Sequence, residues 1–120
     1  MTTSSLDGQE PSYLDVDRAL EQIGEVSALH EMLDMLQDSL DRDVSEISRL
    51  LDQQNVTAAN RLLHALKGFI PIFCVDALCD HVAQVEILSK TASADEVRQA
   101  YGPLVPKLQQ LQTDIDQYMG

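Results

Sequence analysis

Apolar residues recur every three or four positions along most of this chain, which is the spacing of one face of an α-helix. The longest series extends without a break from residue 29 to residue 51. Its members are Leu29, Leu33, Leu36, Leu40, Val44, Ile47 and Leu51. This series predicts one continuous helix that spans roughly 35 Å at about 1.5 Å per residue.

Capping residues place two further helices on either side of this long one. Residues 14–23 form a short amphipathic segment that Gly24 would end, because glycine is favoured just past the end of a helix. After a short turn, a second apolar face predicts a helix over residues 57–73. Asn55 or Thr57 is a candidate for the N-terminal cap of that helix.

Proline and a second capping signal shape the C-terminal half. Pro71 lacks the amide hydrogen that would bond to the carbonyl of Lys67, so we expect the helix to kink or end nearby. Asp76 is a candidate cap for the next helix. The apolar positions of that helix are Leu78, Val82, Val85 and Leu88.

The last helix is predicted to be bent. Ser93 and Glu96 form a capping box that opens it, and its apolar positions continue as far as Ile115. Gly102-Pro103 and Pro106 interrupt this pattern, so we expect a bend there and not a straight rod.

The whole pattern predicts an all-α protein, since no strand-like alternation of apolar and polar residues competes with it. Four long helices, each apolar on one side and joined by short connections, pack most simply as an antiparallel four-helix bundle. The additional short N-terminal helix would cover one end. Residues 1–12 are polar and lack periodicity, so we expect a flexible N-terminal arm there and a single domain over residues 13–120.

Composition and charge exclude several classes of function. The 120 residues include 8 Lys and Arg against 20 Asp and Glu, and the net charge of −12 argues against binding to nucleic acids or anionic membranes. No apolar run reaches the roughly 18 residues of a membrane span, and the first residues lack a signal-peptide pattern, so we expect a cytoplasmic protein. Cys74 and Cys79 are expected to be reduced, and their spacing to His81 does not match a zinc site.

Three residues of the helix over 57–73 fall outside its packing pattern. At about 100° per residue, His64 lies roughly 150° from the centre of the apolar face, and Lys67 and Gly68 lie on the same outward side. We take that apolar face to comprise Leu62, Leu63, Leu66, Phe69, Ile70 and Phe73. An imidazole nucleophile, an ammonium group near phosphoryl oxygens and an unobstructed backbone together suit phosphoryl transfer.

Simpler explanations exist for each of these residues. A surface histidine usually has no catalytic role, a lysine is commonly a solvated charge, and a glycine inside a helix indicates a packing or a functional constraint without distinguishing them. His30 and His81 lie at the edges of their apolar faces, as boundary residues do. The sequence also contains no GxxxxGK nucleotide-binding motif.

The charge around His64 differs from that of the whole chain. No acidic residue occurs in the helix over 57–73, and Arg61 and Lys67 lie three residues before and after His64. Because such positions are neighbours on a helix surface, the sequence predicts a small basic patch that would attract an acidic partner. The residues that we assign to a partner-binding surface are Asn60, Arg61 and Pro71.

The run His64-Ala-Leu-Lys67-Gly68 resembles the HxLKG signature of histidine-containing phosphotransfer (Hpt) domains. The likeness covers about residues 14–118. The opening LDVDRALEQIG resembles the family's short first helix, and Leu78 and Val85-Glu86 stand where many members have a Leu and then Leu-Glu.

The resemblance implies a role for each residue of the signature. His64 would be the phosphoacceptor, Lys67 the residue that stabilises the phosphate, and Gly68 the residue that leaves steric clearance. The chain departs from the family at two places: Phe69-Ile70-Pro71 replaces small polar residues, and Cys74 stands where a glycine is common. Both departures concern the end of this helix and the choice of partner.

By the same resemblance, the chain would relay a phosphoryl group between aspartates of response-regulator receiver domains, in a pathway that includes a hybrid sensor kinase. It would be an intermediate without kinase activity of its own. It would also need no cofactor, since the divalent cation belongs to the receiver. Two alternatives stay open: an Hpt-shaped module that regulates a kinase or receiver without being phosphorylated, and a structural helical adaptor.

Overall fold

The computed structural model describes residues 12–120, and six helices account for most of them. They are α1 (Val16–Ile23), α2 (Val26–Asp52), α3 (Val56–Phe73), α4 (Asp76–Leu88), α5 (Ala94–Tyr101) and α6 (Leu104–Met119). The all-α class predicted from the sequence is confirmed. Of the predicted arm over residues 1–12, only Ser12 lies within the described part of the chain.

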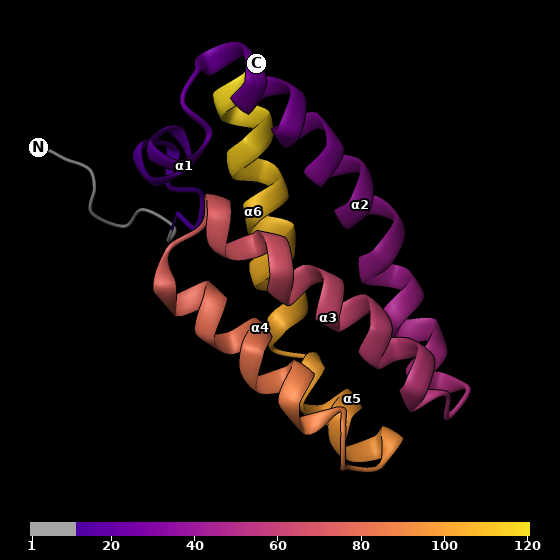
Figure 1. Cartoon of the computed structure of the whole chain (residues 1–120). Helices are drawn as coiled ribbons and strands as arrows, with labels where there is room; N and C mark the ends of the chain where they lie inside the picture. The colour runs from indigo at the N-terminus through magenta and orange to yellow at the C-terminus, as the bar shows by residue number, and fades with distance from the viewer. Residues whose placement is uncertain (1–11) are drawn as a thin grey trace, which may run out of the picture.

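Helices α2, α3, α4 and α6 lie side by side and alternate in direction (Figure 1). α2 and α4 each pack against both α3 and α6, so the four helices close into the predicted antiparallel bundle. α1 covers one end against α2 and α3, and α5 lies at the other end against α2 and α4. No helix within residues 12–120 is both long enough and apolar enough to cross a lipid bilayer.

Aliphatic residues on the inner sides of the helices form one continuous core. All the positions of the predicted series on α2 are buried. The buried face of α3 is centred differently from the prediction, because Leu62 and Phe69 are only half-buried. The buried residues of α3 are Ala59, Leu63, Leu66, Ile70 and Phe73. The reason is that α3 packs against α2 and α4 together, and the positions of these two neighbours decide which side is enclosed.

Two of the predicted N-terminal helix caps form as expected. The side chain of Asn55 accepts a hydrogen bond from the amide of Ala58, and Ser93 and Glu96 make the reciprocal bonds of a capping box. Gly24 has a φ of 96°, a left-handed conformation that favours glycine after a helix.

The predicted cap at Asp76 is wrong. Val75 occupies the capping position of α4 and makes no side-chain cap hydrogen bond. Asp76 is instead the first residue of the helix, where its carboxylate accepts a hydrogen bond from Arg18 of α1 at 2.8 Å. The tertiary contact with α1 thus takes the side chain away from the backbone of its own helix.

Proline acts differently at its three positions in this half of the chain. α3 continues past Pro71 to Phe73. At Gly102-Pro103 the predicted single bent helix is divided into α5 and α6. Pro106 lies in the first turn of α6, where an amide hydrogen would have no partner within the helix.

The segment before α1 is fastened to two parts of the bundle. Asp114 of α6 is buried, and its carboxylate accepts hydrogen bonds from the amides of Tyr13 at 2.7 Å and Leu14 at 3.3 Å. The amide of Val75 bonds to the carbonyl of Tyr13 at 3.0 Å. Backbone and side-chain bonds together therefore fix the entry to α1 beside the turn between α3 and α4.

Asp114→Ala removes the shared acceptor of two backbone amides. We expect the free energy of unfolding to fall by about 1–3 kcal/mol, because an amide that loses its partner in a partly buried place keeps its desolvation cost. Urea denaturation measures the change. Gln117→Ala, at an exposed position of the same helix, is the control and should change stability by less than about 0.5 kcal/mol. Equal losses in the two variants would contradict an anchoring role for Asp114.

Candidate functional site

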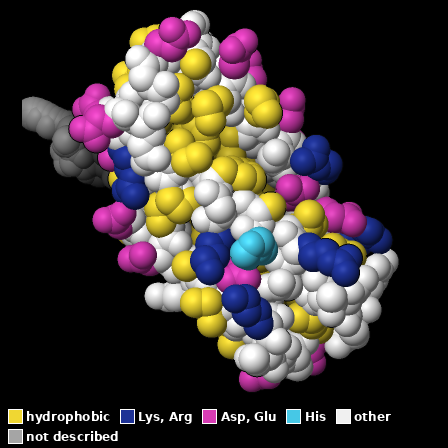
Figure 2. Space-filling view, viewed as in Figure 1, with side chains coloured by type: hydrophobic (Ala, Val, Ile, Leu, Met, Phe, Trp, Pro, Cys, Tyr) yellow, Lys and Arg dark blue, Asp and Glu magenta, His cyan; other side chains and the backbone are white. Residues whose placement is uncertain are grey.

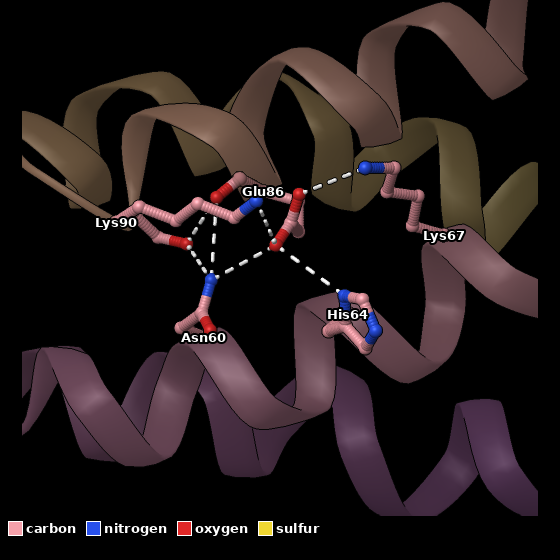
Figure 3. Close-up of polar contacts among 6 residues, drawn as sticks. Asn60, His64, Lys67, Glu86 and Lys90 are labelled. Carbon is pink, nitrogen blue, oxygen red and sulfur yellow. Dashed lines mark hydrogen bonds and ion pairs between the residues drawn. The ribbon is translucent and has the colours of Figure 1, made fainter.

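One side of α3 carries Asn60, His64 and Lys67, spaced by four and three residues, which brings them onto one face of the helix. This face borders α4, as the close-up in Figure 3 shows. The His64 side chain is 71% exposed, while that of Lys67 is 38% exposed. The histidine therefore stands outward in solvent, and the lysine is partly covered and lies toward Glu86 of α4.

Glu86 of α4 lies at the centre of these residues, and its side chain has no exposed surface. Its Oε1 is 3.3 Å from Nζ of Lys67, and its Oε2 is 3.5 Å from Nδ1 of His64. Nζ of Lys90, one turn further along, is 3.7 Å from Oε2. A single carboxylate thus contacts an imidazole and two ammonium groups.

A buried carboxylate is stable only where donors and positive charges surround it. Burial by itself would raise the pKa of the Glu86 carboxyl. Hydrogen bonds from Asn60 and Lys67 and the positive charges of Lys67 and Lys90 act in the opposite direction, and the pKa ends below its ordinary value. Glu86 is therefore a carboxylate at neutral pH.

The position of this carboxylate favours one tautomer of His64. A carboxylate only accepts hydrogen bonds, so the nitrogen that faces it at 3.5 Å, Nδ1, is the one that best carries the ring hydrogen. The lone pair is then on Nε2, on the other side of the ring from Glu86 (Figure 3). An exposed nitrogen with a free lone pair can act as a nucleophile.

Gly68 comes directly after Lys67 on α3 and is exposed. Its φ is not positive, and a Cβ added there would meet nothing within 4 Å. Neither backbone conformation nor packing within the described chain requires a glycine. Its effect is to leave the surface beside His64 open.

Arg61 has no acidic partner within 4.0 Å among residues 12–120, and its side chain is exposed. The described contacts therefore contain no ion pair between Arg61 and an acidic residue of a neighbouring helix. Figure 2 shows a histidine on this face between Lys and Arg side chains. Asn60, which the sequence assigned to a partner-binding surface, is half-buried, and its amide turns inward to Glu86. Pro71 is half-buried near the end of α3.

A comparison with protein-family models matches residues 31–119 to the Hpt domain. The chain belongs to the Hpt domain family. No curated protein and no solved structure matches it. As an Hpt domain it has a phosphotransfer-related role in two-component signalling, and such domains interact with receivers and kinases in phosphorelays. The match begins within α2, so the likeness seen in the sequence from residue 14 to residue 30 lies outside it.

Glu86 and Lys90 belong to the candidate site, although no role for either was predicted from the sequence. A signal for Glu86 exists in the sequence, because it lies four residues after Val82 and next to Val85 on the inner side of α4. An acidic residue on a buried face indicates either a structural pair or a functional site. No comparable signal marks Lys90, which only its distance from Glu86 connects to the site.

Apolar side chains of this Hpt domain gather near the site, on the face shown in Figure 2. A groove between α2 and α3 begins one residue beyond Gly68, at Phe69. Met35 is the most exposed of its apolar lining residues, with 68% of its surface accessible to solvent. The lining residues are Met32, Met35, Leu36, Ser39, Phe69 and Phe73.

The other histidines and the cysteines lie apart from the site. His30 contacts the hydroxyl of Tyr118 at 3.3 Å, and His81 is half-buried with Nδ1 unpaired among the described residues. Cys74 is buried and Cys79 half-buried, and both are free thiols. Residues 12–120 contain no group of three acidic, histidine or cysteine side chains that could hold a metal ion.

Glu86→Gln tests whether the buried carboxylate of Glu86 stabilises the folded chain. The pKa of Glu86 is lower in the folded chain than its ordinary 4.5, so its contribution to stability is present above pH 4.5 and is lost as the pH falls through the folded value. We expect the unaltered chain to be more stable than Glu86→Gln near neutral pH, by about 1 kcal/mol. The difference should shrink in acid.

Urea denaturation at several pH values measures this difference. Glu31→Gln, at an exposed position of α2, is the control and should change stability by less than about 0.5 kcal/mol. A Gln variant as stable as the unaltered chain at neutral pH would mean that burial of the charge outweighs its partners.

Proposed function

We propose that this Hpt domain carries a phosphoryl group on Nε2 of His64 and passes it between aspartates of receiver domains. The observation that supports this most directly is the arrangement of the imidazole, with Nδ1 facing a buried carboxylate and Nε2 free on the surface. The surrounding cations and the exposed backbone at Gly68 fit the same role.

The transfer needs no acid or base beyond this arrangement. The lone pair of Nε2 attacks the phosphorus of a receiver's aspartyl phosphate, the bond from phosphorus to the aspartyl oxygen breaks, and the aspartate leaves as a carboxylate. Nδ1 keeps its hydrogen, and Glu86 balances the positive charge that develops on the ring. Attack by the aspartate of a second receiver reverses these steps and restores the neutral imidazole.

In this proposal two lysines stabilise the negative charge of the phosphoryl group. Lys67 and Lys90 lie on either side of the carboxylate beneath His64 and can turn their ammonium groups toward phosphoryl oxygens. Gly68 provides clearance for the incoming phosphate or the receiver's backbone. The divalent cation of the reaction belongs to the receiver, and this chain therefore needs no cofactor of its own.

Docking would use the surface around His64. The groove between α2 and α3 offers apolar contact area, and Arg61 offers a positive charge without an acidic partner in the described chain. A receiver whose phosphorylation site is acidic would fit this combination. We place the reaction in the cytoplasm, with a hybrid sensor kinase supplying the phosphate.

His64→Gln is expected to abolish labelling when the protein is mixed with a phosphorylated receiver, because glutamine has no nucleophilic nitrogen. The measurement is the acid-labile phosphate transferred to the Hpt domain. His30→Gln and His81→Gln are matched controls that should be labelled normally. The unaltered chain with ATP alone should stay unlabelled.

Labelling of His64→Gln at the rate of the unaltered chain would contradict the assignment. Absence of label on the unaltered chain, with every receiver tried, would favour a binding module that is never phosphorylated.

Arg61→Glu is expected to slow association with a receiver at low salt, because it reverses the local charge beside His64 on a chain of charge −12. The deficit should shrink toward physiological salt, where the Debye length is about 8 Å. Stopped-flow association across a salt series measures it. Lys107→Glu on α6 makes the same charge change elsewhere and is the control. Equal effects of the two variants would leave Arg61 without a local role.

A further inference from the structure

The side chain of Asn60 connects α3 to the last turn of α4 through three acceptors. Its Nδ2 lies 2.8 Å from Oγ of Ser89, 3.1 Å from Oε2 of Glu86 and 3.3 Å from the carbonyl oxygen of Glu86. A carboxylate and a carbonyl cannot donate, so the nitrogen of the Asn60 amide has to face them. Figure 3 shows this amide directed toward α4.

The carbonyl of Glu86 needs such a donor because it lies at the end of a helix. The last four carbonyls of an α-helix have no amide of their own helix to accept from. After α4 the chain forms a turn. The amide of Ser89 bonds to the carbonyl of Val85, and the amide of Lys90 bonds to the carbonyl of Ile87. The hydroxyl of Ser89, at 2.6 Å, and Nδ2 of Asn60 serve the carbonyl of Glu86 instead.

Asn60 therefore holds Glu86 at both its backbone and its carboxylate. The oxygen that it contacts, Oε2, is the same one that faces Nδ1 of His64. Lys67 holds the other oxygen, Oε1, so the plane of the carboxylate is fixed by one donor on each side. A carboxylate released from Asn60 would be free to turn toward the two lysines and away from the imidazole.

We propose that Asn60 is a positioning residue, which keeps the carboxylate of Glu86 where it holds the ring hydrogen of His64 on Nδ1. This inference rests on the proposed function for its effect on phosphotransfer. Its effect on the imidazole is a property of this chain alone. It also replaces the assignment of Asn60 to a partner-binding surface.

The tautomer of His64 is the direct readout, since the ¹⁵N chemical shifts of the two ring nitrogens show which one carries the hydrogen. These shifts are measured on the neutral imidazole, without any receiver. The variants are Asn60→Ala, Ser89→Ala and Glu86→Ala, with Arg61→Ala as the control one residue away on α3. Alanine is a better helix former than asparagine, so Asn60→Ala should keep α3 intact.

We expect the hydrogen on Nδ1 in the unaltered chain and in Arg61→Ala. Asn60→Ala and Glu86→Ala should both move the population toward the hydrogen on Nε2. Ser89→Ala should move it in the same direction, since it removes the second contact of the Asn60 amide. Transfer from a phosphorylated receiver should slow by roughly tenfold in Asn60→Ala. The reason is that a displaced Glu86 carboxylate would leave fewer molecules with the His64 imidazole oriented for attack.

A folded Asn60→Ala with the unaltered chain's ring shifts would overturn the proposal. So would a Glu86→Ala variant that leaves the tautomer unchanged. If Asn60→Ala does not fold, Ser89→Ala decides, and unaltered ring shifts in that variant would overturn the proposal as well. Failure of the proposed function would be observed separately. In that case the unaltered chain takes no phosphate on His64, whichever tautomer the ring shifts show.

Discussion

The carboxylate of Glu86 is withdrawn from solvent between α3 and α4, and a charge in such a place must be surrounded by donors and opposite charges. Asn60, Lys67 and Lys90 supply them, and the imidazole of His64 completes the ring of contacts. The groups that stabilise the buried charge are thus also the groups that the proposed phosphotransfer uses. One electrostatic constraint accounts for both.

The bundle makes this arrangement rigid beneath a site that must stay open. Both α3 and α4 contribute to the continuous core, and the segment before α1 is bonded to Asp114 and to the turn between these helices. His64 itself projects outward, at 71% exposure. A fixed base under an exposed imidazole suits the proposed transfer, because a receiver would have to reach the histidine while the orienting groups stay in place.

Charge is distributed on two scales in this protein. The chain as a whole carries −12, which opposes approach to any acidic partner. Close to His64 the balance is reversed, since Glu86 is outnumbered by Lys67 and Lys90, and Arg61 adds a positive charge on the same helix. At physiological salt the nearest charges act more strongly than distant ones, so the proposed docking would depend on the local balance of charge.

The sequence by itself determined what depends on one helix at a time. Periodicity located α1 to α4 and indicated the bundle class, although it joined α5 and α6 into one bent helix. The 100° rotation per residue placed His64, Lys67 and Gly68 on one outward side. These relations hold for any α-helix, whatever it packs against. The same reasoning centred the buried face of α3 too near Leu62 and Phe69, because the enclosing neighbours lie outside that helix.

Only the tertiary structure decided which residues of different helices meet. It brought Glu86 and Lys90 to His64, turned Asn60 inward, and gave Asp76 a partner in α1 in place of a capping role. Contacts between helices depend on their relative register and rotation, which the packing of all the core residues sets together. No spacing along a single helix contains that information, and for this reason the residue at the centre of the site is the one whose role the sequence left unassigned.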